Sequence, residues 1–177
     1  MRKILATLFA AALAIGIPAT AASAEETAST CSYECTWQGE TGWAYGSDFA
    51  GANWAMFYTL QAKPSEKPYE STPIYAGQHY LVGHAYFGPS SIPGMITIYV
   101  VLDGPNGDGA YIVGGESVKV GHWTKDPSGI TNPPPGKLKY KGTAIGNRYA
   151  EVTVRYVDGK TNYYAIHLDM LILSPSS

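Results

Sequence analysis

The chain has 177 residues, of which 15% are charged, and its formal net charge is −2 at pH 7. This length is typical of one domain with its own hydrophobic core, and the acidic balance without a basic patch argues against nucleic acid as a partner. Twenty Gly, 12 Pro and 14 Tyr indicate many turns and few helices, so the composition favours an all-β protein.

Residues 1–24 have the three parts of an export signal. Arg2 and Lys3 precede an apolar run over residues 4–17, and Ala22-Ser23-Ala24 matches the small-x-small cleavage pattern. The apolar run of about 14 residues is shorter than the roughly 20 that a transmembrane helix needs. We therefore expect cleavage after residue 24, no membrane span in the mature protein, and a secreted, extracellular location, with the periplasm as the alternative.

Cys31 and Cys35 are the two cysteines of the sequence. In an oxidising compartment such a pair is expected to form a disulfide, and closing this small loop contributes roughly 2 kcal/mol. A redox site prefers two intervening residues, and a zinc site needs further ligands nearby. We therefore predict a structural staple within a polar lead-in segment, residues 25–40.

From residue 41 onward, apolar residues alternate as they do in half-buried strands. Strands are predicted over residues 41–45, 54–60, 74–87 (one or two strands, interrupted at Gly77 and Gly83), 95–102, 117–123, 138–141, 149–157 and 163–173. Turns are predicted over residues 103–109, 126–136 and 158–159.

The spacing of these strands predicts an all-β fold over residues 41–173. Eight or nine antiparallel strands with short turns favour a β-sandwich of jelly-roll or immunoglobulin-like type. The alternation also predicts which side chains share a face: Ile96, Ile98, Val100 and Leu102 in one strand, and Tyr164, Ile166 and Leu168 in the last.

Several short motifs resemble a family of secreted bacterial domains of unknown function. Residues 41–46 (TGWAYG) and 53–58 (NWAMFY) resemble that family's T-A-W-A-x-G and N-W-A-T-Y blocks, and later landmarks such as 167–169 (HLD) follow in order. The resemblance covers residues 41–172 and implies a β-sandwich without implying an activity. Gly42, where the family usually has Ala, and the long turn at 103–109 depart from its pattern.

Trp123 is the main candidate for ligand binding. It ends a predicted strand beside the Pro-rich loop 126–136, and with Tyr140 and the loop prolines it could form a ledge for a ligand. The alternative is a Trp that packs beneath its own loop. Trp43 and Trp54 have apolar neighbours in phase, which favours the core over a sugar-stacking platform.

Two patterns resemble metal sites. His167 and Asp169 share a strand face, as in metal sites and general-base pairs, but no third ligand is evident and we expect a hydrogen-bonded structural pair. The turn at 103–109 resembles a calcium loop, with Glu116 as a further ligand, but Asp103 is out of phase. A plain hairpin turn is therefore predicted there, and neither a metal nor a cofactor is expected.

The sequence lacks a Gly-x-Ser-x-Gly elbow and a closely spaced pair of carboxylates on a groove-like strand, so we predict that the protein is not an enzyme. The first function class is an extracellular binding or surface-interaction module, with aromatic-rich loops that contact a carbohydrate or protein ligand. The second is an inhibitor or effector that acts on a partner enzyme through the Pro-rich 126–136 loop. A structural matrix protein is a further alternative.

Overall fold

The computed structural model describes residues 35–51, 53–65 and 70–175, which together form one antiparallel β-sheet with two short 3₁₀-helices. The prediction of an all-β, antiparallel fold is confirmed. The strands are β1 (Cys35–Ala44), β2 (Ser47–Asp48), β3 (Met56–Leu60), β4 (Glu70–Ala76), β5 (Tyr80–Pro89), β6 (Met95–Val101), β7 (Ala110–Ile112), β8 (Val118–Trp123), β9 (Tyr140–Gly142), β10 (Ala144–Ile145), β11 (Tyr149–Arg155) and β12 (Asn162–Pro175). The 3₁₀-helices are η1 (Gly107–Gly109) and η2 (Pro135–Lys137).

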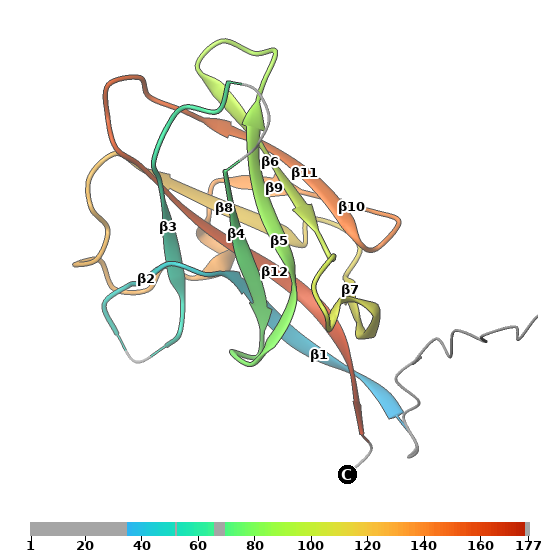
Figure 1. Ribbon diagram of the computed structural model, residues 1–177. Coiled ribbons are helices and arrows are strands. Elements are labelled where there is room, and N and C mark those ends of the chain that lie inside the picture. Colours follow the sequence, from blue (N-terminus) through green and yellow to red (C-terminus); the bar gives the residue numbers. More distant parts are fainter. Residues whose placement is uncertain (1–34, 52, 66–69, 176–177) are drawn as a thin grey trace, which may run out of the picture. The chain divides into compact units, whose positions relative to one another are not determined.

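The last strand, β12, organises the sheet because it is long enough to pair with four others (Figure 1). Along one edge it pairs with β3 near its start and with β1 over the rest of its length. Along the other edge it pairs with β8 and then with β7. From β1 the sheet continues through β4, β5, β6, β11 and β10.

The turn between β4 and β5 illustrates how local sequence shapes the sheet. Gly77 and Gln78 have φ of 53° and 68°, and the amide of His79 donates to the carbonyl of Ala76. Two successive positive φ angles define the hairpin turn whose twist matches that of antiparallel strands. The predicted interruption at Gly77 is therefore a tight hairpin between two strands.

The main core lies on one face of β12 and follows the predicted alternation. Tyr164, Ile166 and Leu168 are fully buried on β12, and the apolar side chains of β6 with even numbers are buried with them. Because β8 and β11 both contribute to this cluster, the sheet curls around it. The sheet is not closed into a barrel by the pairings of the described strands.

A second, smaller cluster packs on the opposite face of β12. Its buried members are Trp43, Phe49, Ala55, Phe57, Leu138 and Ala165, with Trp54, Trp123 and Tyr163 packed partly buried against them. We call this set the aromatic cluster. The prediction that Trp43 and Trp54 belong to the interior is confirmed, with Trp43 4% exposed and Trp54 half-buried.

Several element boundaries differ from the sequence prediction. The expected lead-in segment ends before residue 40, because β1 begins at Cys35 and pairs with the end of β12. The described residues contain twelve strands instead of eight or nine, since β2, β7 and β10, which were not predicted, have only two or three residues each. Segments this short contain too few residues to show an alternating pattern. Residues 1–24 and Cys31 lie outside the described residues, so the export signal and the disulfide stay predictions.

Candidate functional site

An open pocket of about 490 Å³ lies where β8 and β11 end, beside the turn that leads into β12. The end of β8 is about 30 residues before the β11–β12 connection in the sequence, and the two segments meet at one end of the sheet (Figure 1). The residues that line the pocket are His122, Trp123, Thr124, Lys125, Arg155, Val157 and Lys160. The pocket therefore contains the Trp that the sequence singled out, among residues that the sequence did not connect with it.

Trp123 belongs partly to the aromatic cluster and partly to the pocket. It lies opposite Tyr163 in the β8–β12 ladder, and its ring meets the ring of Phe49 edge-on at a centroid distance of 5.5 Å. Its outer ring carbons lie over Gly121, at the place where a Cβ atom would otherwise stand. The indole is thus held by packing while part of its surface remains exposed to the pocket, which combines the two alternatives for this residue.

The turn 157–160, which lines the pocket through Val157 and Lys160, is held by Asn162, which is 1% exposed. Its Nδ2 donates to the carbonyls of Val157 and Lys160, and its Oδ1 accepts the amide of Val157. These bonds fix the amide orientation, so His122 Nε2 must donate to Oδ1 across 2.8 Å. One buried amide therefore fixes the turn 157–160 and one ring tautomer at the same time.

The charge of the pocket comes from exposed cations. Burial lowers the pKa of His122, the hydrogen bond to Asn162 opposes this shift, and the charges of Arg155 and Lys139 add to it. His122 is therefore neutral at pH 7. Lys125, Arg155 and Lys160 are exposed around the opening, and the seven lining residues include no carboxylate.

Tyr140, the second predicted ligand residue, lies elsewhere. It pairs with Val120 in the β8–β9 ladder and packs partly buried against the main core, whereas Trp123 packs against the aromatic cluster on the other face. The structure therefore does not bring Trp123 and Tyr140 together on one ledge. The reason is the alternation of β8, which directs Val120 and Trp123 to opposite sides of the sheet.

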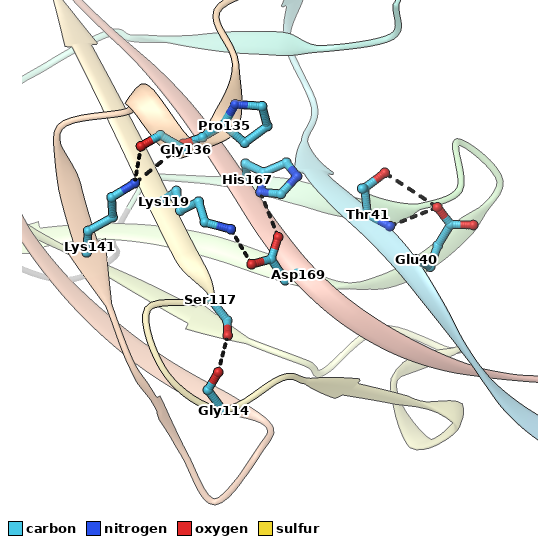
Figure 2. A network of polar contacts seen from close by, with 10 residues as sticks. All are labelled: Glu40, Thr41, Gly114, Ser117, Lys119, Pro135, Gly136, Lys141, His167 and Asp169. Atoms are coloured by element: carbon cyan, nitrogen blue, oxygen red, sulfur yellow. Dashed lines mark hydrogen bonds and ion pairs between the residues drawn. The ribbon is translucent and has the colours of Figure 1, made fainter.

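His167 and Asp169 form part of a polar network with Lys119 (Figure 2). They alternate in phase with Ala165 of β12, so they lie on the face of this strand that carries the aromatic cluster. The expected hydrogen bond between them is absent, because His167 Nδ1 and Asp169 Oδ1 are 3.7 Å apart and Nδ1 has no hydrogen-bond partner. Asp169 instead forms an ion pair with Lys119 of β8. The prediction of a hydrogen-bonded pair is wrong because a cross-strand Lys reaches the carboxylate.

His167 is 2% exposed and meets the indole of Trp43 edge-on, with ring centroids 4.9 Å apart. Burial lowers its pKa to about 4, the charge of Asp169 opposes the shift, and Lys119 and Lys141 add to it. Lys141 itself is held by the carbonyls of Pro135 and Gly136, and Figure 2 shows this contact beside the His167 group. The network therefore consists of a buried, neutral His167 imidazole beside a structural ion pair between Lys119 and Asp169.

The two carboxylates of the turn at 103–109 are bonded to side chains outside the turn. Asp103 accepts hydrogen bonds from His84 Nδ1 at 2.7 Å and from the Tyr86 hydroxyl at 2.5 Å. Burial raises the pKa of Asp103, but these hydrogen bonds outweigh it and leave the pKa below its ordinary value. Asp108 pairs with Arg148 at 2.6 Å. Within the described residues, no group of three or more His, Cys, Asp or Glu side chains is arranged to hold a metal ion.

No family model, no curated protein and no solved structure matches this chain. The resemblance to a family of secreted domains therefore stays a prediction. No helix in the described part of the chain is long and apolar enough to cross a membrane.

Sequence reasoning missed the cations of the pocket. Arg155 and Lys160 flank the predicted turn at Asp158-Gly159, and Lys125 follows Trp123 closely. Each could be predicted as exposed from its place at a strand end. Their approach to Trp123 depends on β8 and β11 ending at the same side of the curled sheet, which no local pattern indicates.

Proposed function

We propose that the protein is an exported binding module without catalytic activity, and that the pocket at Trp123 is its ligand site. The observation that carries this proposal is a half-buried indole, fixed by packing, that faces an open pocket with a polar rim. Ligand pockets combine apolar surface with a few placed polar groups in this way. A flat aromatic ring also suits the C–H face of a sugar, which favours a carbohydrate ligand.

Binding is favoured over catalysis by the chemistry of the lining residues. His122 is engaged through Nε2 with Asn162, and the lining set contains cations, one hydroxyl, one apolar side chain and the indole. These groups hold and orient a ligand, whereas hydrolysis needs a nucleophile or a pair of acid and base groups at one reacting centre.

The proposal includes the finer predictions about the molecule. Export through residues 1–24 and a staple between Cys31 and Cys35 suit a protein that works outside the cytoplasm. A jelly-roll or immunoglobulin-like sandwich agrees with a core to which β4, β5, β6, β8 and β12 all contribute buried side chains. Membership of the secreted domain family agrees with the export signal, the disulfide and the sandwich fold proposed here.

The test is thermal unfolding of the purified chain with a panel of soluble oligosaccharides. A ligand at about a hundred times its Kd adds about 2.7 kcal/mol of stability and raises the melting temperature. We expect the shift to disappear in Trp123→Ala and to shrink in Trp123→Phe, which keeps a ring in the aromatic cluster. Trp37→Phe is the matched control, because Trp37 is 42% exposed and stacks on Tyr111 away from the pocket. A shift that persists in both Trp123 variants would place the ligand elsewhere.

A second candidate function, inhibition of a partner enzyme, is supported by the ordered state of the loop 126–136. The amide of Ala50 donates to Ile130 and that of Asn132 donates back to Ala50, both at 3.0 Å. The loop is therefore pinned while Ile130 remains 41% exposed, and a pre-ordered loop loses little entropy on binding.

Inhibition is tested with a panel of exported proteases and glycosidases. An inhibitor slows one of them at a one-to-one ratio, and Ile130→Asp abolishes the effect whereas Val113→Asp, at an exposed position outside the loop, does not. If no enzyme in the panel is slowed, this second candidate is rejected.

A further inference from the structure

We propose that the ligand of the Trp123 pocket is an acidic saccharide, in which the sugar face lies on the indole and a carboxylate or sulfate group is bound by Lys125, Arg155 and Lys160. This inference rests on the proposed function, since it names the chemical class that the same pocket selects.

The first step of the argument is the concentration of like charge at this site. The chain has an excess of acidic residues, with a formal net charge of −2, yet three cations line one pocket, Lys125 from the segment after β8 and Arg155 and Lys160 from the two sides of the turn between β11 and β12. Three exposed cations around one opening repel one another, and a bound anion relieves that repulsion. Their convergence is therefore more than the average surface of this protein predicts.

The second step is that these cations lack carboxylate partners within the described residues. The ion pairs there involve Lys63, Lys119, Arg148 and two histidines, and none includes a pocket cation. The neighbouring acids are already engaged, since Asp158 pairs with Lys63 at 3.2 Å and Asp126 accepts the amide of Ser128 at 2.8 Å. The positive charge is thus available to a ligand.

The third step is that the pocket is formed before a ligand enters. Asn162 binds the backbone of Val157 and the carbonyl of Lys160. Arg155 lies at the end of β11, where its carbonyl accepts the hydroxyl of Tyr164, and Trp123 is held against Phe49. A pre-formed arrangement of charge and ring binds more tightly than one that must be ordered by the ligand. The geometry therefore suits a ring and an anion that belong to one rigid molecule.

Shape and charge together distinguish this ligand from two simpler ones. A neutral sugar would use the indole and leave three cations without a function in binding. A free inorganic anion would use the cations and leave the exposed face of Trp123 bare. A uronate or sulfated sugar uses both within one residue of a polysaccharide.

The test is isothermal titration calorimetry on the purified full chain with matched ligand pairs. Oligogalacturonate is compared with its methyl ester, which keeps the sugar rings and removes the charge, and dextran sulfate is compared with dextran. We expect a charged ligand to bind about tenfold or more tightly than its neutral partner, with an affinity that falls as salt rises. The first pair reports on carboxylates and the second on sulfates.

Variants then assign the charge effect to the pocket. Arg155→Gln and Lys160→Gln each weaken binding of the charged ligand about three- to tenfold and leave the neutral ligand unchanged. Lys137→Gln, an exposed cation that does not line the pocket, is the matched control and changes neither. Trp123→Phe weakens both ligands of a pair.

The outcomes separate this inference from the proposed function. Equal binding of charged and neutral partners, with loss in Trp123→Phe, overturns the acidic class and leaves the sugar-binding module intact. No binding of any saccharide overturns both. A single-stranded oligonucleotide that binds as tightly as the charged saccharide, with the same response to Arg155→Gln, also overturns the inference in favour of a phosphate backbone.

Discussion

His122 and Asn162 are joined by a hydrogen bond of 2.8 Å that links strand β8 to the first residue of β12. Through the same amide, Asn162 also binds the backbone of Val157 and Lys160. One buried side chain thus connects three of the segments around the pocket. This contact makes the stability of the fold and the shape of the candidate site interdependent.

Replacing Asn162 by Ala is expected to destabilise the protein by about 2–4 kcal/mol, because it removes three part-buried hydrogen bonds to the backbone of Val157 and Lys160 and the partner of His122 Nε2. Chemical denaturation measures the loss. Asn106→Ala is the matched control, since Asn106 is exposed and its side chain forms no cap in the turn before η1. We expect the control to stay within about 0.5 kcal/mol of the parent, and an equal loss in both variants would contradict the role of Asn162.

Gly121 is expected to be intolerant of a side chain because the ring of Trp123 occupies its Cβ position. Gly121→Ala should force the indole outward, at a cost of about 1–3 kcal/mol for overpacking, and should shift Trp fluorescence and weaken ligand binding together. Gly39→Ala is the control, because nothing lies within 4 Å of its Cβ position. An unchanged fluorescence spectrum in Gly121→Ala would show that Trp123 is not held there.

His167 is expected to make the protein less stable in mild acid. Its folded-state pKa of about 4 lies below the ordinary value of 6.5, so between these values the unfolded chain binds a proton that the folded chain does not. The free energy of unfolding is therefore unaffected by the titration of His167 well above pH 6.5. It falls by about 3 kcal/mol as the pH drops from 6.5 towards 4.

The measurement is the free energy of unfolding as a function of pH for the parent and for His167→Gln. We expect a shallower decline in the variant, whereas His79→Gln, at an exposed position, should follow the parent curve. Parallel curves for the parent and His167→Gln would show that another group causes the acid sensitivity.

The ion pair between Lys119 and Asp169 is expected to contribute more than an exposed pair, because the Lys119 side chain is only 15% exposed. A double-mutant cycle with Lys119→Met and Asp169→Asn should give a coupling of about 1 kcal/mol, the upper end for pairs that keep contact with solvent. The same cycle on Lys63 and Asp158, which are 53% and 73% exposed, should give about 0.3 kcal/mol. Equal couplings would show that burial of Lys119 has no effect.

The strands that alternate over five or more residues could be predicted from the sequence. The side chains that β6 and β12 contribute to the main core lie at every second position, since each side chain of a strand points opposite to the one before it. The turns at Gly77 and at residues 126–136 could be predicted for a similar reason, because Gly and Pro act on the local backbone.

The sequence by itself therefore determined the all-β class, the positions of the long strands along the chain, and the interior position of Trp43. It also placed Trp123 at the end of a strand. Only the tertiary structure decided that Tyr140 lies across the sheet from Trp123, that Lys119 reaches Asp169, and that Arg155 and Lys160 meet Trp123 at one pocket. The physical reason is the distance along the chain over which each interaction acts. Alternation and turn chemistry act over a few neighbouring residues, whereas β12 brings together strands from both ends of the chain through pairings that no single segment encodes.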